Sequence, residues 1–160
     1  MKKKISRYRP LLVLILVAAL GAGAWVYGVK TTSWPHLFMG LFFCQFSMLK
    51  LFHPSKFVAG FRMYDLLAKA FPAYAYIYPF IELGLGLAYL SFFAPIATYS
   101  ITVFIMGINA IGVLVALRRR LDVRCACMGT LLDVPLSTVT LSEDIVMGGM
   151  AGWMLIKTFL

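Results

Sequence analysis

The feature that most constrains this chain is a series of long apolar runs separated by short basic segments. A helix needs about 20 apolar residues to cross the hydrocarbon of a bilayer. Four runs meet this length and a fifth is shorter; they cover residues 11–29, 34–52, 74–93, 96–117 and 145–160. The fifth spans only if residues 141–144 form its first turn. Because backbone amides find no water in lipid, we expect all five runs to be helices, which predicts an all-α bundle.

Composition favours lipid as the solvent of this bundle. Hydrophobic residues make up 62% of the chain and charged residues 13%, whereas a soluble domain carries about 25% charged residues. We expect a four-helix membrane domain over residues 31–160, preceded by an N-terminal transmembrane helix or signal anchor over residues 1–30. A signal-peptidase-like site lies at residues 22–24, but the apolar run continues to Val29, so we expect this helix to stay uncleaved.

The basic residues predict an orientation. The net charge of +9 does not indicate a nucleic-acid-binding protein, because the positive residues cluster at the ends of apolar runs. If all five runs span, only Lys30 and Lys157 of the 15 basic residues lie on one side. The positive-inside rule then places the N-terminus in the cytoplasm of a bacterial inner membrane and the C-terminus outside.

The connections between runs have patterns of their own. Residues 54–73 place Phe57, Phe61 and Tyr64 at helical spacing between charges, which predicts an amphipathic surface helix ended by Pro72. A tight turn at residues 94–95 predicts an antiparallel hairpin. Residues 136–140 are expected to form a linker, with Ser142 capping the last helix.

Two cysteines, Cys125 and Cys127, carry the most specific chemical signal. They are separated by one alanine on a loop expected at residues 121–135, next to arginines. A disulfide in so small a ring is strained and therefore easily reduced, and Arg124 beside Cys125 favours the thiolate. In a reducing cytoplasm such a pair suits redox exchange or soft-metal binding rather than a permanent crosslink.

The chain resembles the MauE family, within the wider group of DoxX-like membrane proteins, over residues 35–160. The shared pattern is a helix ending in lysine, a surface segment ending in tyrosine, a proline–glutamate helix and a Cys-x-Cys-x-Gly loop; it falls on Lys50, Tyr64, Pro79, Glu82, Cys125, Cys127 and Gly129. The family more often has glycine where this chain has Ala126. The resemblance implies a redox-associated protein that supports maturation of another protein, as in maturation of the disulfide-rich small subunit of methylamine dehydrogenase. It gives no direct warrant for methylamine as the context here.

Glu82 and Lys50 are the charged residues expected inside the bundle. An acidic group is costly in lipid, so Glu82 needs a partner, and Lys50 lies at a similar depth. The pair would either hold the bundle together or protonate the site below the cysteine loop. Cys44 is more simply a buried small residue than a resolving thiol. Gln45 and Asn109 are expected to make hydrogen bonds between helices.

Three methionines share one face of the last helix. Met147, Met150 and Met154 fall in a narrow arc with Glu143, opposite Gly148 and Gly152, which suit close helix packing. The stripe is explained by packing, but thioethers also suit Cu(I). His36 and His53 stand at helix ends beside prolines and are expected at the membrane interface.

The sequence favours a membrane thiol–disulfide protein, with thiol–disulfide oxidoreductase as the enzyme class left open. Cys125 and Cys127 would exchange disulfides with a thioredoxin- or glutaredoxin-like protein or with a client protein, supported by Arg124, Glu82, Lys50, Tyr64 and Gly129. A soft-metal carrier for Cu(I) or Hg(II), using the cysteines and the methionine stripe, is the alternative. A structural membrane subunit is the third possibility. No cofactor is fixed; a quinone and Cu(I) both stay open.

Overall fold

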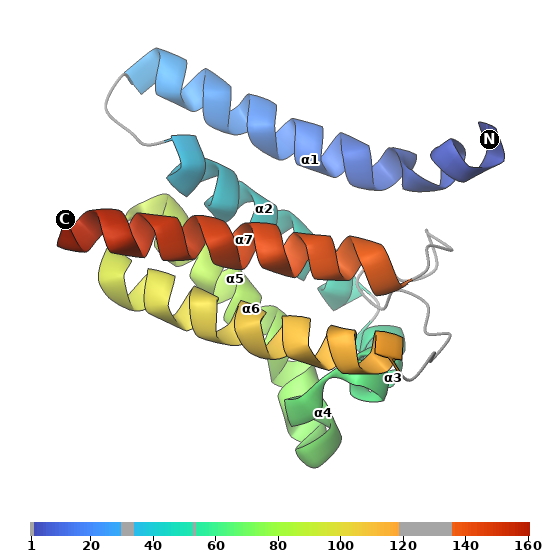
Figure 1. Ribbon diagram of the computed structural model, residues 1–160. Coiled ribbons are helices and arrows are strands. Elements are labelled where there is room, and N and C mark those ends of the chain that lie inside the picture. The colour runs from blue at the N-terminus through green and yellow to red at the C-terminus, as the bar shows by residue number, and fades with distance from the viewer. Residues whose placement is uncertain (1, 30–33, 53, 119–135) are drawn as a thin grey trace.

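The computed structural model describes residues 2–29, 34–52, 54–118 and 136–160, and within these ranges it is helical without strands (Figure 1). The elements are α1 (Lys2–Val29), α2 (Trp34–Phe52), α3 (Pro54–Tyr64), α4 (Leu66–Ala70), α5 (Pro72–Ser91), α6 (Pro95–Arg118) and α7 (Leu136–Phe159). The predicted all-α fold is confirmed. The second run matches its helix end to end, and the others agree within a few residues, except that α1 and α7 begin about nine residues early.

The helices form two closely packed pairs, α2 with α5 and α6 with α7, and α1 lies against α2 (Figure 1). Ala18 and Ala22 of α1 are fully buried, and a side chain at Gly21 would come within 3.0 Å of Leu41 on α2. Small residues therefore let α1 approach α2 closely. Helix α1 makes its main contacts with this one helix.

The α2–α5 pair depends on glycine at its contact. A Cβ on Gly86 would lie 2.7 Å from the sulfur of Cys44, 2.9 Å from its backbone nitrogen and 3.1 Å from the carbonyl oxygen of Gly40. Real Cβ atoms do not tolerate such distances to backbone, so a side chain at Gly86 would push the two helices apart. This close approach brings the last turn of α2 and the middle of α5 near enough for their charged side chains to meet.

The predicted hairpin between α5 and α6 is present. Helix α5 ends where Phe92 adopts a left-handed conformation, with φ of 54°, and Ala94 follows with φ of 40°. The backbone N–H groups of Phe92 and Phe93 donate to Tyr89 and Ala88 carbonyls, which closes the last turn. We call this side of the molecule the hairpin end.

The other side, called here the α3 end, gathers the start of α1, the end of α2, helix α3, the end of α6 and the start of α7 (Figure 1). The C-terminus lies at the hairpin end. The basic residues at positions 2–9, 50–69 and 118 thus belong to one end of the bundle, as the charge asymmetry predicts. Which side of a membrane that end faces stays a prediction.

Two local expectations were wrong. Helix α7 begins at Leu136, so residues 136–140 are helical rather than a linker, and Ser142 lies inside the helix instead of capping it. The surface segment is two helices rather than one, because Asp65 breaks it and caps α4. The segment does end just before Pro72, as predicted, and Pro72 then opens α5, where its missing N–H needs no partner.

Within the described residues, α2 and α6 are long and apolar enough to cross a membrane, and α1 holds a shorter apolar stretch, Leu12–Gly28. Large apolar side chains are exposed on several long helices: Phe80 on α5, Phe104 on α6 and Ile156 on α7 are each about 60% exposed or more. Exposed apolar surface on so many helices suits lipid rather than water. Five spans remain our prediction.

Candidate functional site: a buried polar chamber at the α3 end

The centre of the site is an ion pair between α2 and α5. The ammonium of Lys50, in the last turn of α2, donates to both carboxylate oxygens of Glu82. Both side chains are about 5% exposed. The predicted pairing is confirmed, and its cause is physical, since an isolated charge in so apolar a setting would cost several kcal/mol.

Aromatic rings surround the ammonium group. Lys50 Nζ lies 4.9 Å from the ring centre of Tyr78 and 5.5 Å from that of Phe57, distances at which the ring face attracts a cation. Phe57 stacks on Phe61 at 4.9 Å, and Phe61 contacts Tyr78 at 4.6 Å. The apolar face predicted on residues 54–64 therefore packs into the bundle.

A hydrogen bond links this region to α6. The side-chain nitrogen of Asn109 donates to the hydroxyl of Tyr78, whose ring faces the ammonium of Lys50. The bond joins α6 to α5, and so joins the two helix pairs, as the predicted role of Asn109 in helix–helix hydrogen bonding requires. The amide oxygen of Asn109 is buried and has no hydrogen-bond partner.

These groups line a small chamber of about 30 Å³. Helix α7 contributes two acidic residues to its wall, Glu143, which is half-buried, and Asp144, which is 7% exposed. A buried water needs a cavity of roughly 10–15 Å³ and two to four polar partners, so the chamber suits one or two water molecules. One of them would satisfy the Asn109 oxygen.

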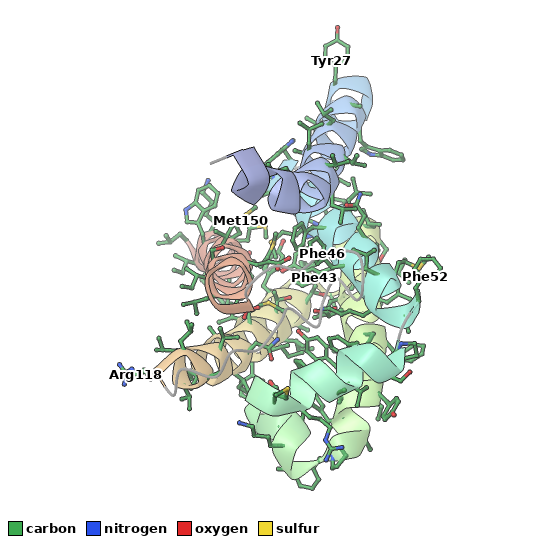
Figure 2. All side chains as sticks on the ribbon, turned by 90° about the vertical axis from the view of Figure 1, so that its right-hand side faces the viewer. Tyr27, Phe43, Phe46, Phe52, Arg118 and Met150 are labelled. Carbon is green, nitrogen blue, oxygen red and sulfur yellow. The ribbon has the colours of Figure 1, made fainter. Side chains whose placement is uncertain are left out.

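Apolar rings close the remaining sides. Phe43 and Phe46 point from α2 toward the space between the helices, which Figure 2 shows along the bundle from the α3 end. Met147 of α7 and Met106 of α6 complete this lining. A low dielectric of this kind strengthens every charge interaction in the chamber, so proton positions there depend strongly on one another.

Asp65 is a further buried acid at this end, and sequence reasoning missed it. It is fully buried between α3 and α4, and its Oδ1 accepts the backbone N–H of Ala68 at 2.7 Å. Burial raises the pKa of this carboxyl, against the lowering effect of the capping hydrogen bonds and of Lys69. The signal available in the sequence was an acid at a break in the helical pattern, which is typical of a helix cap.

Several predicted site residues lie outside the described residues: Arg124, Cys125, Cys127, Gly129 and His53. Tyr64 ends α3, and its side chain is not described. The flanks of the cysteine segment are described, because Arg118 ends α6 and Leu136 begins α7. Both flanks are at the α3 end, where Figure 2 shows Arg118 pointing outward.

Cys44 is a free, partly buried thiol on α2, and its sulfur lies against Gly86 of α5. This agrees with the packing interpretation. Gln45, expected to bond between helices, has a buried side-chain oxygen without a partner, so its predicted role is not confirmed.

The methionine stripe lies as the packing interpretation requires. Met147 and Met154 are buried and Met150 is half-buried, on a helix whose Gly148 and Gly152 face α6. A Cβ on Gly148 would be 3.3 Å from Met106, so the glycine face is the close contact. Figure 2 shows Met150 on the side of α7 that faces α1.

Sequence reasoning also missed the two acids of the chamber wall and the burial of His36. Glu143 and Asp144 were assigned to a first helical turn, but the early start of α7 puts them about two turns inside. His36 was expected at the interface and is instead 2% exposed, held among aromatic rings. Its burial depends on the hairpin folding over the start of α2, which no local pattern shows.

One comparison with known proteins is informative. A family model described as methylamine utilisation protein MauE matches residues 28–157, which includes Lys50, Glu82 and the cysteine segment and omits nearly all of α1. No curated protein and no solved structure matches the chain. The family match, together with the apolar helices, indicates a membrane protein. Over most of its length, then, the chain belongs to the MauE family of methylamine utilisation proteins.

Proposed function

We propose that this protein exchanges disulfides through Cys125 and Cys127 and thereby supports maturation of another protein in methylamine utilisation. The observation that carries the proposal is the position of the polar chamber. The chamber lies at the α3 end of the bundle. The cysteine segment is attached to the same end on both sides, because it joins the last residue of α6 to the first residue of α7. A thiol pair and a set of buried proton-holding groups therefore belong to the same end of the molecule.

The chemistry is a balanced exchange. The strained Cys125–Cys127 disulfide accepts the attack of a thiolate from the partner, a mixed disulfide forms, and a second partner thiol releases it. The partner leaves with a disulfide, and the two protons of its thiols pass to Cys125 and Cys127. Arg124 favours the thiolate form, because a neighbouring cation lowers the free energy of the anion. The Lys50–Glu82 pair would hold or return protons below the segment.

The partner is a thioredoxin- or glutaredoxin-like protein or the client itself, and the site is the cytoplasmic face of a bacterial inner membrane. This orientation is tested in cells that carry Cys44→Ser, so that the segment holds the only thiols. An impermeant thiol reagent should label inverted vesicles and not intact cells. Labelling from outside would place the exchange on the other side and replace a cytoplasmic partner by an external one.

The exchange itself is tested by a gel-shift assay of thiol state in cells, again with Cys44→Ser as background. We expect Cys125 and Cys127 to cycle between thiol and disulfide. Replacing one of them by serine should stop the exchange and leave the partner's thiols reduced, because the remaining cysteine cannot form the disulfide that the partner thiolate attacks. Cysteines that stay reduced, together with normal function of the double serine variant, would leave a structural subunit as the correct assignment.

A soft-metal carrier is the second candidate, and one observation favours it. Met147 lines the chamber at the α3 end, and Met154 lines a cleft at the hairpin end, so the stripe runs from one to the other. Thioethers along such a line could pass Cu(I) between ends. The packing role of the same methionines explains the stripe without a metal, so we place this candidate second.

A further inference from the structure

The hairpin end holds a partly open cleft that the proposed function does not use. Its volume is about 400 Å³, within the range of small-molecule sites. It lies between the start of α2, the hairpin and the end of α7, and its walls include His36, Phe92, Tyr99, Trp153, Met154 and Lys157. Four of these six residues have aromatic rings, counting the imidazole.

His36 is the group in this cleft that points to a ligand. Its Nδ1 lies 2.7 Å from the carbonyl oxygen of Tyr89, and a carbonyl only accepts, so Nδ1 carries the hydrogen in this contact. In the neutral ring Nε2 is then an acceptor. Nε2 is buried and has no hydrogen-bond partner. A buried acceptor without a donor costs about 1–3 kcal/mol.

The rings around His36 hold it in place. The imidazole stacks on Phe92 with centres 4.1 Å apart and planes 7° apart, and meets the edge of Tyr99 at 5.5 Å. Lys157 places its ammonium 4.2 Å from the ring centre of Trp153. The cleft therefore combines aromatic walls, one fixed acceptor and one cation.

We propose that this cleft binds an aromatic ring that carries a hydroxyl group, a phenol or hydroquinone, with the hydroxyl donating to Nε2 of His36. The aromatic walls suit a planar ring, and the cation of Lys157 attracts the electron-rich oxygen. Other classes fit less well. A small ammonium ion would meet the charge of Lys157, a phosphate dianion has no proton to donate, and a purely apolar ligand leaves Nε2 unpaired. The inference is independent of Cys125 and Cys127.

Binding is measured by the fluorescence of Trp153 in purified protein that carries Trp25→Phe and Trp34→Phe, so that one tryptophan reports. The probe is 4-methoxyphenol, and its matched control is 4-methoxytoluene, in which a methyl group replaces the hydroxyl. We expect saturable quenching by 4-methoxyphenol. 4-Methoxytoluene should bind about tenfold more weakly, which corresponds to one lost hydrogen bond of roughly 1.4 kcal/mol. Equal affinities would overturn the proposal.

His36→Phe keeps an aromatic ring in the wall and removes the acceptor, so it should weaken the phenol about tenfold and leave 4-methoxytoluene unchanged. Met150→Leu, on the same helix as Trp153 but outside the cleft, is the control and should change neither. If His36→Phe does not fold, the two probes on the parent protein still decide. Undiminished binding to His36→Phe contradicts the assignment. Quenching by phosphatidylglycerol vesicles but not by 4-methoxyphenol, with that quenching lost in Lys157→Met, would show a lipid headgroup site instead.

Discussion

The two ends of the bundle differ in the charge of their buried polar groups. At the α3 end, Lys50 pairs with Glu82 directly, Tyr78 and Asn109 lie beside the pair, the Asn109 oxygen lacks a partner, and the chamber is small. At the hairpin end, the cleft is larger and partly open, and His36 keeps an acceptor without a donor. The same two helices, α2 and α5, contribute to both ends.

The difference follows from charge. A buried ion must be paired within the protein, because no ligand can be relied on to supply several kcal/mol whenever the chain folds. A neutral imidazole nitrogen costs far less when it lacks a partner, so it can wait for one. We therefore assign the ion pair to stability and proton handling, and the neutral imidazole acceptor in the larger cleft to binding.

The largest effect is expected from removing one charge of the ion pair at the α3 end. Glu82→Ala leaves the buried ammonium of Lys50 without its carboxylate, and we expect a loss of about 3–5 kcal/mol in the free energy of unfolding. Glu82→Gln should lose less, since the amide oxygen can still accept from Lys50. Chemical unfolding in detergent measures both.

A double variant separates the effect of the two charges from the effect of the space that the two side chains fill. Lys50→Met with Glu82→Leu replaces both charges by apolar groups and should recover most of the stability, because no lone ion remains. If the double variant folds but disulfide exchange stops, the pair serves the chemistry as well as the fold. If Glu82→Ala is as stable as the parent, the contrast between the two ends fails.

The close contact that brings the pair together is tested next. Gly86→Ala places a Cβ against Cys44 and Gly40 and should cost about 1–3 kcal/mol, the usual effect of overpacking. Gly84→Ala, two residues away on the same helix, meets nothing within 4 Å and is the matched control. We expect no loss from it in thermal unfolding. Equal effects from the two changes would mean that glycine acts only through helix propensity.

Asp65 is a second test at the α3 end, since this buried acid caps helix α4 instead of forming an ion pair. Asp65→Ala should lose about 1 kcal/mol with the cap, and Asp65→Asn should keep the cap. Because the pKa is raised in the folded state, that state holds the proton more tightly than the unfolded chain. The contribution of Asp65 to stability therefore falls as pH rises from the ordinary aspartate pKa through the folded pKa.

Asp65→Asn removes this titration, so its stability relative to the parent should improve as the pH is raised through that window. The measurement is unfolding at a series of pH values from about 3 to 7, with the Asp65→Asn protein as reference at each. A parent that gains stability relative to Asp65→Asn over the same range would contradict the raised pKa.

The smallest effect is expected from the methionines that join the two ends. Leucine at Met147, Met150 and Met154 changes shape little, and each swap in a core usually costs under about 1.5 kcal/mol. A disulfide relay has no use for thioethers, so thiol cycling by gel shift should persist in the triple variant. A copper accumulation assay runs beside it. Intact cycling with lost copper handling would decide for the metal carrier.

Sequence reasoning succeeds where one physical requirement acts alone. The need to pair a charge in an apolar helix identified Lys50 and Glu82, and the need to satisfy a buried amide identified Asn109 as a link between helices. Hydrocarbon thickness gave the long helices. Each of these predictions used only the residue, its depth and its surroundings.

It fails where a position depends on how distant segments fold. The start of α7 was placed too late, because residues 136–140 are polar and weakly helical, and this concealed the place of Asp144 in the chamber wall. His36 is near a helix end and beside a proline, a pattern typical of an interface. Its burial comes from Tyr89, Phe92 and Tyr99 of the hairpin, more than 50 residues away in the chain.

The Lys50–Glu82 pair has a consequence for biosynthesis. The two residues are 32 positions apart, so a ribosome adding residues from the N-terminus delivers Lys50 before its carboxylate exists. At synthesis rates of about 5–20 residues per second, the lysine waits on the order of seconds. Lys50 is two residues from the end of α2, so its flexible stem can reach the headgroup layer in the meantime. Glu82 has a shorter side chain and lies in the middle of α5, so it could not reach that layer in the same way; the order lysine first, glutamate second is the one that insertion tolerates.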